Sequence, residues 1–356
     1  MNVSLLIIAG GKSSRLGVDK RFAEVGGEKL LEKILRKSTT INFVEKFLCT
    51  EKISPELELL ADKYGAKILI DEIPDAGALS GIANGLKNIK ADWALAVSAD
   101  MPFFDFKALE PLTEKFSGVQ AVIPICGGKY QTLAAFYNKN LAKLFYEELA
   151  SGQRKIISAI KKIPHAFIEF PAEEIFFNVN TRADLRLARG RAENLSRPTP
   201  IISIVAPESG TGKTTFIERL TKIFSEQGIK IGVIKSDAHG FNLDVAGKDS
   251  WRFQQAGAKS VAVVSPKSWF MIQKTSEREN FLSVSEKMNV DLIFTEGRTQ
   301  RIFPTISLWR GHGDKIADEN ICAIFSSMPE TSAEICEFDL DDTISAERIL
   351  KFLAGF

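Results

Sequence analysis

The chain of 356 residues is long enough for two domains, and its 45% hydrophobic and 26% charged residues are the balance of a globular protein. A net charge of +1 argues against general nucleic-acid binding, so that an anionic ligand would need a local site. The sequence shows no signal peptide, no apolar run of ~20 residues and no C-x-x-C pair, which leads us to expect a soluble cytoplasmic protein with free thiols and no membrane partner.

Apolar runs alternate with amphipathic stretches along the first half, which predicts a mostly parallel sheet with helices on both faces. The predicted strands are 4–9, 44–49, 66–70 and 93–97, and the predicted helices are 29–37, 55–64 and 80–87. Ligands of such sheets bind at the carboxyl ends of the strands. The unusual loops of this half fall at those ends, so we expect a binding site there.

The loop AGGKSSRLGVDK at 9–20 directly follows the first predicted strand. It lacks the G-x-G-x-x-G fingerprint and is not a P-loop. Gly10 and Gly11 would let the backbone approach a base and phosphates. Arg15 and Lys20 would neutralise a triphosphate and stabilise the charge of the departing pyrophosphate. The loop resembles the signature loop of nucleotidyltransferases that join a nucleoside triphosphate to an acceptor phosphate, and a surface loop with solvated cations is the alternative.

Carboxylates and a second glycine turn follow other predicted strands. Asp71 follows AKILI, and GALSG at 77–81 opens a helix where Gly77 would offer backbone groups to a base or a ribose. Asp100 ends WALAVSAD, where a carboxylate is well placed to hold Mg²⁺ between phosphates. A helix cap is the alternative role for Asp100.

The segment FFNVNTRADL at 176–185 places Asn178 and Asn180 on the same side of an extended stretch. Thr181 and Asp184 form a Thr-x-x-Asp pattern that predicts a helix cap. Because the cap leaves the two asparagines unexplained, we interpret them as contacts to the acceptor or substrate, with a structural role as an equal alternative.

Four motifs in order, AGGKSSRLGVDK, IDEIPDAGALSG, SADMPF and FNVNTRADL, make residues 1–190 resemble molybdenum cofactor guanylyltransferase (MobA). The resemblance implies a Rossmann-like nucleotidyltransferase domain that converts GTP and Mo-molybdopterin, with Mg²⁺, to molybdopterin guanine dinucleotide and pyrophosphate. It implies GTP contacts at Ile8, Ala9, Gly10, Lys20, Asp71 and Asp100, with Asp100 on the metal, and we add Gly11 and Gly77 from the two glycine turns. Ala78 stands where the family often has proline.

We expect direct displacement, in which the terminal phosphate of the acceptor attacks the α-phosphorus of GTP without a covalent enzyme intermediate. Catalysis would consist of positioning and charge stabilisation by Mg²⁺, Arg15, Lys20 and Asp100. Cytidylyl- and sugar-nucleotidyltransferases usually read AAG where this chain has AGG at 9–11, so the double glycine favours guanine. A transferase for CTP or a sugar phosphate stays an alternative.

The polar stretch RGRAENLSRPTP carries two prolines, and we place a linker at 191–200. A second α/β series follows, with predicted strands at 201–205, 230–234, 260–264, 290–295 and 321–325. The two halves do not match in sequence, so a duplication is not supported.

The second half contains GTGKTT at 210–215 between a predicted strand and a predicted helix, which is the context of a phosphate-binding P-loop. The predicted contacts are Gly210, Thr211, Gly212, Lys213, Thr214, Thr215 and Glu296. Backbone N–H groups would cradle the phosphates, Lys213 would reach the β- and γ-phosphates, and Thr214 would bind Mg²⁺. Glu296 ends VDLIFTE and can serve as a Walker-B acid. Pro207 replaces the usual first glycine, so the motif is incomplete.

The motifs SGTGKTT, AGKDSWRFQQAGA and DLIFTEG make residues 201–356 resemble the molybdopterin-guanine dinucleotide biosynthesis adaptor family (MobB). The resemblance implies a P-loop GTP binder with weak or no turnover that assists a guanylyltransferase. It implies as partners a molybdenum insertase and apo-molybdoenzymes or their chaperones. His239 lies where that family tends to carry histidines, and a structural role is the simpler interpretation. A GTP-switched cofactor carrier or scaffold stays open, as does a kinase activity of this half.

Overall fold

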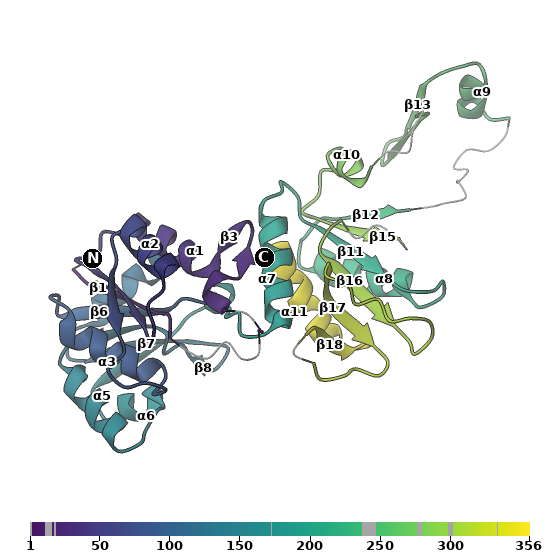
Figure 1. Cartoon of the computed structure of the whole chain (residues 1–356). Coiled ribbons are helices and arrows are strands. Elements are labelled where there is room, and N and C mark those ends of the chain that lie inside the picture. The colour runs from purple at the N-terminus through teal and green to yellow at the C-terminus, as the bar shows by residue number, and fades with distance from the viewer. Residues whose placement is uncertain are drawn as a thin grey trace. The chain divides into compact units, whose positions relative to one another are not determined.

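The computed structural model describes residues 2–10, 16–17, 19–171, 173–236, 247–275, 280–297, 302–332 and 334–356. Its contacts divide it into two compact units (Figure 1). The first is Met1–Ala192 with Ser332–Cys336, and the second is Glu193–Thr331 with Glu337–Phe356. Strands and helices alternate in both, which confirms the predicted α/β class. Among the described residues we find no helix whose length and apolarity suit a membrane span.

The first unit is built on an eight-stranded sheet with the order β10–β7–β9–β6–β1–β4–β5, in which β8 pairs with β7. The strands are β1 (Ser4–Ile8), β4 (Lys46–Thr50), β5 (Lys67–Ile70), β6 (Trp93–Ser98), β7 (Ala121–Cys126), β8 (Lys129–Tyr130), β9 (Ala134–Asn138) and β10 (His165–Glu169). As predicted, β1 runs parallel to β4 and β6, and β4 runs parallel to β5. β9 runs antiparallel to β6 and β7, so the sheet is mixed beyond β6.

Helices cover both faces of this sheet (Figure 1). One face carries α1 (Leu30–Lys37), α2 (Pro55–Tyr64) and α4 (Phe106–Leu109), and the other carries α3 (Ala78–Asn88), α5 (Leu141–Ala150) and α6 (Ile156–Ile160). Leu5 and Ile7 pack with the first set, and Leu6 and Ile8, which point the opposite way, pack with the second. A Cβ at Gly85 of α3 would lie 2.5 Å from Leu6 Cδ1, so any other residue at this position would force the buried Leu6 side chain to shift.

The remaining elements of this unit are short or peripheral. They are η1 (Lys20–Phe22), β2 (Glu24–Val25), β3 (Glu28–Lys29), η2 (Ser38–Thr40), η3 (Glu110–Lys115), η4 (Glu174–Phe176) and α7 (Arg182–Leu195), whose last residues, from Glu193, belong to the second unit. The predicted cap of α7 is confirmed, because the Asp184 amide donates to Thr181 Oγ1 at 3.1 Å and the Thr181 amide donates to Asp184 Oδ2 at 2.8 Å.

The predicted linker 191–200 begins as the last turns of α7. Within the second unit, the buried Asn194 side chain fixes the start of the next strand. Its Nδ2 donates to the Leu353 carbonyl at 3.0 Å, and its Oδ1 accepts from the Ile201 amide at 3.0 Å.

The second unit has a six-stranded sheet in the order β12–β15–β11–β16–β17–β18. The strands are β11 (Ile201–Val205), β12 (Ile231–Lys235), β15 (Leu292–Glu296), β16 (Thr305–Trp309), β17 (Ile321–Ser326) and β18 (Cys336–Asp339). The pairs from β12 to β17 are parallel. The helices beside it are α8 (Lys213–Glu226), α10 (Phe281–Ser285) and α11 (Thr343–Ala354). Phe216 of α8 packs on Phe325 of β17 with ring centroids 5.2 Å apart.

One predicted strand of the second series belongs elsewhere. The strand at 260–264 forms as β13 (Ser260–Val264), but it pairs antiparallel with β14 (Trp269–Gln273) in a separate two-stranded sheet. α9 (Asp249–Gln255) precedes it. Val264 and Trp269 are exposed. The prediction that this strand joins the parallel series is therefore wrong, because its apolar run lines a hairpin instead of a buried layer.

Candidate active site and P-loop

The loops that follow β1, β4, β5 and β6 meet at one edge of the first sheet, as the sequence predicts. Backbone hydrogen bonds join their tips directly. The Ala9 amide donates to the Cys49 carbonyl at 2.8 Å, and the Ala99 amide donates to the Ile8 carbonyl at 3.0 Å. The amide of Asp71 donates to the carbonyl of Thr50 at 2.9 Å. The polar residues after these strands are thus held close together by the main chain.

Lys20 and Asp100 form an ion pair at this edge, with Nζ 2.5 Å from Oδ2. Asp100 is 3% exposed, and its Oδ1 has no hydrogen-bond partner among the described residues. A buried carboxylate oxygen without a donor is unusual and fits a ligand that is a cation. In the described part of the chain no group of three acidic, histidine or cysteine side chains could hold a metal ion.

Asp71 lies in a tight setting between two backbone segments. A Cβ at Gly10 would lie 3.3 Å from its Oδ2, and a Cβ at Gly81 would lie 3.3 Å from its Oδ1. Burial, with the nearby charge of Glu51 as a second cause, raises the pKa of Asp71 to about 6. Glycine at 10 and 81 therefore lets the chain close around a carboxylate that changes charge near neutral pH.

A pocket of about 430 Å³ opens beside these residues, a size within the about 300–1,000 Å³ of ordinary ligand sites. Its lining is Ala9, Gly10, Arg21, Thr50, Glu51, Lys52, Pro74 and Asp75. Arg21 donates to Thr50 Oγ1 at 3.0 Å and pairs with Asp19 at 2.6 Å. Arg21 and Lys52 are cations of the pocket that the sequence reasoning missed. Arg21 directly follows Lys20, the last residue of the signature loop, and this position was the available signal.

The asparagine segment lies beside Asp100, because the Val179 amide donates to the Asp100 carbonyl at 2.9 Å. Asn178 Nδ2 donates to the Phe176 carbonyl at 2.9 Å, and the Asn180 side chain is exposed. The segment is therefore in reach of the site, while contacts of the two asparagines to an acceptor stay a prediction.

Of the remaining predicted residues of this half, three lie in the described part of the chain and two lie outside it. Ile8 and Ala9 are buried, with Ile8 packed in the core, so they would meet a nucleotide through the backbone. Gly77 precedes α3 with φ +71°, a conformation that favours glycine. Gly11 and Arg15 lie outside the described residues, as does His239 of the second half.

The P-loop context in the second unit is as predicted, since the loop lies between β11 and α8. Gly210 and Gly212 have positive φ values of 79° and 100°. Lys213 Nζ donates to the Glu208 carbonyl at 3.0 Å, which holds it across the loop. Among the other predicted residues, Thr211 is buried and Thr215 is exposed on the first turn of α8.

Thr214 and Glu296 come together from separate elements. Thr214 Oγ1 donates to Glu296 Oε1 at 2.9 Å, and Lys235 lies 3.9 Å from Glu296 Oε2. A hydroxyl and a carboxylate at this distance fit the two protein ligands of Mg²⁺ in a P-loop site. Arg310 donates from Nε to the Thr211 carbonyl at 2.8 Å. Arg310 was not predicted as a residue of this site. It lies in the loop after β16, and the sequence pattern did not predict that strand.

The two units and their sites define a nucleotide-binding α/β protein of the nucleotidyltransferase type. Residues 5–165 match the family described as MobA-like NTP transferase domain, and residues 201–327 match molybdopterin guanine dinucleotide synthesis protein B. A relative from Peptoclostridium acidaminophilum, named "Probable molybdenum cofactor guanylyltransferase", is 32% identical over 197 residues, which are 51% of this chain and 86% of that protein. The chain therefore belongs to the molybdenum cofactor guanylyltransferase family, which confirms the resemblance stated from the motifs.

Solved structures are similar to each half. The Archaeoglobus fulgidus molybdopterin-guanine dinucleotide biosynthesis protein A is 25% identical, with a TM-score of 0.45 over 52% of this chain and 97% of that chain. Bacillus subtilis MobB is 21% identical, with a TM-score of 0.33 over 44% of this chain and 99% of that chain.

Proposed function

We propose that this protein transfers GMP from GTP to Mo-molybdopterin, forming molybdopterin guanine dinucleotide and pyrophosphate. The observation that carries the proposal is the ion pair of Lys20 with the buried Asp100 at the strand edge of a chain from this family. Mg²⁺, when bound there, would neutralise phosphate charge, with Asp100 as its protein ligand.

The residues of the chain then have separate tasks. Lys20 is paired with Asp100 before GTP arrives, and the triphosphate offers it a second anionic partner. Arg15 would stabilise the leaving pyrophosphate. Asn178 and Asn180 would orient the acceptor, whose terminal phosphate attacks the α-phosphorus of GTP in line.

We propose that the second unit is a GTP-binding adaptor in which Lys213 and Thr214 hold phosphates and Mg²⁺ and Glu296 completes the site. Working boundaries are 1–190 for the transferase, 191–200 for the linker and 201–356 for the adaptor. A cytoplasmic location, and a molybdenum insertase and apo-molybdoenzymes or their chaperones as partners, belong to the same proposal.

Pyrophosphate release from GTP, Mg²⁺ and Mo-molybdopterin tests the transferase. Wild type should release pyrophosphate only with the acceptor, and Asp100→Ala should abolish release while the protein stays folded. Asp92→Asn is the control, because its exposed side chain pairs with Lys139 just before the start of β6. GTP binding without pyrophosphate would favour the carrier or scaffold, and turnover with CTP instead of GTP would favour the other nucleotidyltransferases.

Calorimetry separates the two sites. Wild type should bind two GTP per chain, and Lys213→Ala should bind one. A wild-type stoichiometry of one that Lys213→Ala leaves unchanged would remove the second site. Phosphorylation of an acceptor by residues 201–356, dependent on Lys213, would replace the adaptor with a kinase.

A further inference from the structure

The turn that follows Asp100 is held by a lysine from a different part of the chain. Lys37 is the last residue of α1, and its Nζ donates to the Pro102 carbonyl at 2.9 Å and to the Phe104 carbonyl at 3.0 Å. The sequence separations are 65 and 67 residues. One side chain therefore bridges two main-chain acceptors of the segment that begins at the candidate catalytic aspartate.

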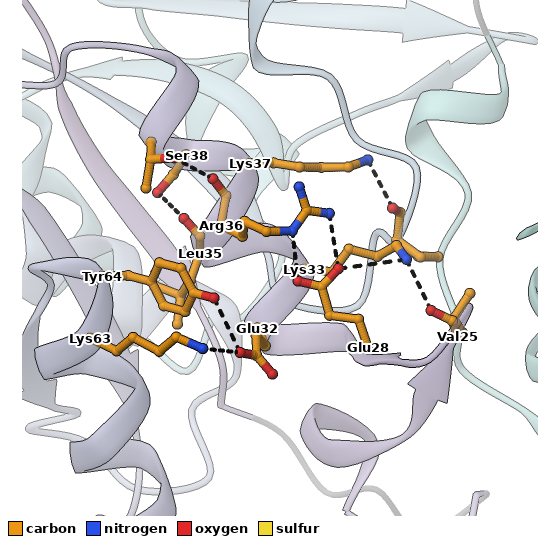
Figure 2. A network of polar contacts seen from close by, with 12 residues as sticks. Val25, Glu28, Glu32, Lys33, Leu35, Arg36, Lys37, Ser38, Lys63 and Tyr64 are labelled. Carbon is orange, nitrogen blue, oxygen red and sulfur yellow. Dashed lines mark hydrogen bonds and ion pairs between the residues drawn. The ribbon is translucent and has the colours of Figure 1, made fainter. Parts of the chain in front are cut away.

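The surroundings of Lys37 disfavour its charge. Burial, followed by the neighbouring charges of Lys33 and Arg36, lowers the pKa of Lys37 to about 8, against the opposing influence of Asp105 and Glu28. Figure 2 shows Lys33, Arg36 and Glu28 close to it. Lys33 donates to the Val25 carbonyl at 2.9 Å, and Arg36 pairs with Glu28 at 2.8 Å. An ammonium that stays where burial disfavours its charge is a better indication of a functional role than a solvated one.

The turn has further anchors besides Lys37, in its own backbone and in its buried side chains. The Phe104 amide donates to the Met101 carbonyl at 3.2 Å, and both side chains are buried. On the other side, the Asp100 carbonyl accepts from the Val179 amide at 2.9 Å. The main chain of Asp100 is thus fixed between the Val179 amide and a turn whose carbonyls need donors.

We propose that Lys37 is a positioning residue that holds the 101–104 turn and through it aims the Asp100 carboxylate at the reacting phosphates. The inference rests on the proposed guanylyl transfer. Lys37 does not touch the substrate in this scheme. Loss of its two hydrogen bonds would let the turn shift, and a displaced carboxylate lowers the rate of the chemical step more than the affinity for GTP.

Three variants of the full chain test the proposal. Lys37→Met keeps the aliphatic stem and removes the donors, and Lys37→Arg keeps a donor for each carbonyl. Lys46→Met is the matched control, because Lys46 is also partly buried and donates to a backbone carbonyl, that of Tyr64 at 3.2 Å, at the opposite end of the sheet.

Two readouts are compared, namely steady-state kinetics and hydrogen exchange at the amides of Phe104 and Val179. For Lys37→Met we expect kcat to fall roughly tenfold to a hundredfold with the KM for GTP nearly unchanged, and faster exchange at both amides. Lys37→Arg should restore most of kcat, and Lys46→Met should change neither readout.

An equal loss of kcat in Lys37→Met and Lys46→Met would overturn the inference, as would unchanged exchange at the two amides. Hydrogen exchange is measured without substrate. It therefore tests whether Lys37 holds the 101–104 turn even if the protein does not catalyse the transfer reaction. Wild-type protein that makes no pyrophosphate would refute the proposed function alone.

Discussion

The first unit should become more stable when the charge of Asp71 is removed. Because burial and Glu51 raise its pKa from 3.8 to about 6, the folded protein binds this proton more tightly than the unfolded chain does. Stability from this group is therefore present at acid pH and is lost as pH rises from about 4 to about 6. Asp71→Asn keeps the shape and removes the charge, so it should stabilise the protein above pH 6.

The size of this stability gain follows from the pKa shift of Asp71. About two pKa units at ~1.36 kcal/mol each give an upper limit of ~3 kcal/mol, and Asp71 keeps part of its surface in water, so screening reduces this to about 1 kcal/mol. A gain of that size raises the midpoint of a domain of this length by roughly 2–4 °C. Near pH 4 the carboxyl is protonated in the folded protein and roughly half protonated in the unfolded chain, so the difference between the two proteins should shrink.

Thermal unfolding followed through Trp93 reports the stability change of the first unit, which contains Asp71. Trp93 is the one tryptophan in residues 1–200 and is stacked on Phe116, with ring centroids 3.9 Å apart. A 5-fluorotryptophan label gives it a resonance of its own. Glu51→Gln should give part of the gain at pH 8 and nothing more in the Asp71→Asn background. A stability difference that is the same at pH 4 and pH 8, or a less stable Asp71→Asn at pH 8, would refute the reasoning.

The remaining predictions concern packing and the P-loop. Gly85→Ala should destabilise the first unit by about 1–3 kcal/mol in urea unfolding, because the new Cβ meets Leu6, and Leu6→Val should restore part of the loss. Asn194→Ala should cost the second unit about 1–3 kcal/mol, since it leaves two buried backbone groups unpaired, and an unchanged midpoint would contradict the role of Asn194 as an anchor. Thr214→Ala and Glu296→Gln should each weaken GTP binding roughly tenfold with Mg²⁺ and much less without it, a comparison that calorimetry makes directly.

The sequence was sufficient to predict those structural features that depend on one short stretch of the chain. The buried apolar run of β1, the cap of α7 and the P-loop context each depend on fewer than about a dozen neighbouring residues. Loops at the ends of parallel strands could be placed at one edge because that geometry is general. The approach of Gly10 and Gly81 to Asp71 depends instead on how β1, β5 and α3 pack, and no local pattern encodes it.

One wrong prediction and one feature that was not predicted have the same physical cause. The apolar run at 260–264 has the composition of a buried parallel strand, yet it forms an exposed hairpin with β14. The antiparallel insertion of β9 between β6 and β7 likewise depends on partners that lie far apart in the chain. Hydrophobicity indicates that a segment forms a strand, but the rest of the sheet determines which strand it pairs with. Lys37 was missed for this reason, since its two acceptors lie 65 and 67 residues away.

The carboxylates at the strand edge explain why a triphosphate site there would need a divalent cation. Asp100 already neutralises Lys20, and Glu51 and Asp71 add negative charge nearby. Two unit charges at ~4 Å interact by about 4 kcal/mol at an effective dielectric constant of ~20, so a bare phosphate beside Asp100 would lose much of its binding energy. A cation between them reverses the sign of that interaction. Among the described residues Oδ1 of Asp100 has no hydrogen-bond partner. Such a buried oxygen would be costly in a protein that bound only neutral ligands, and a cation would offset this cost.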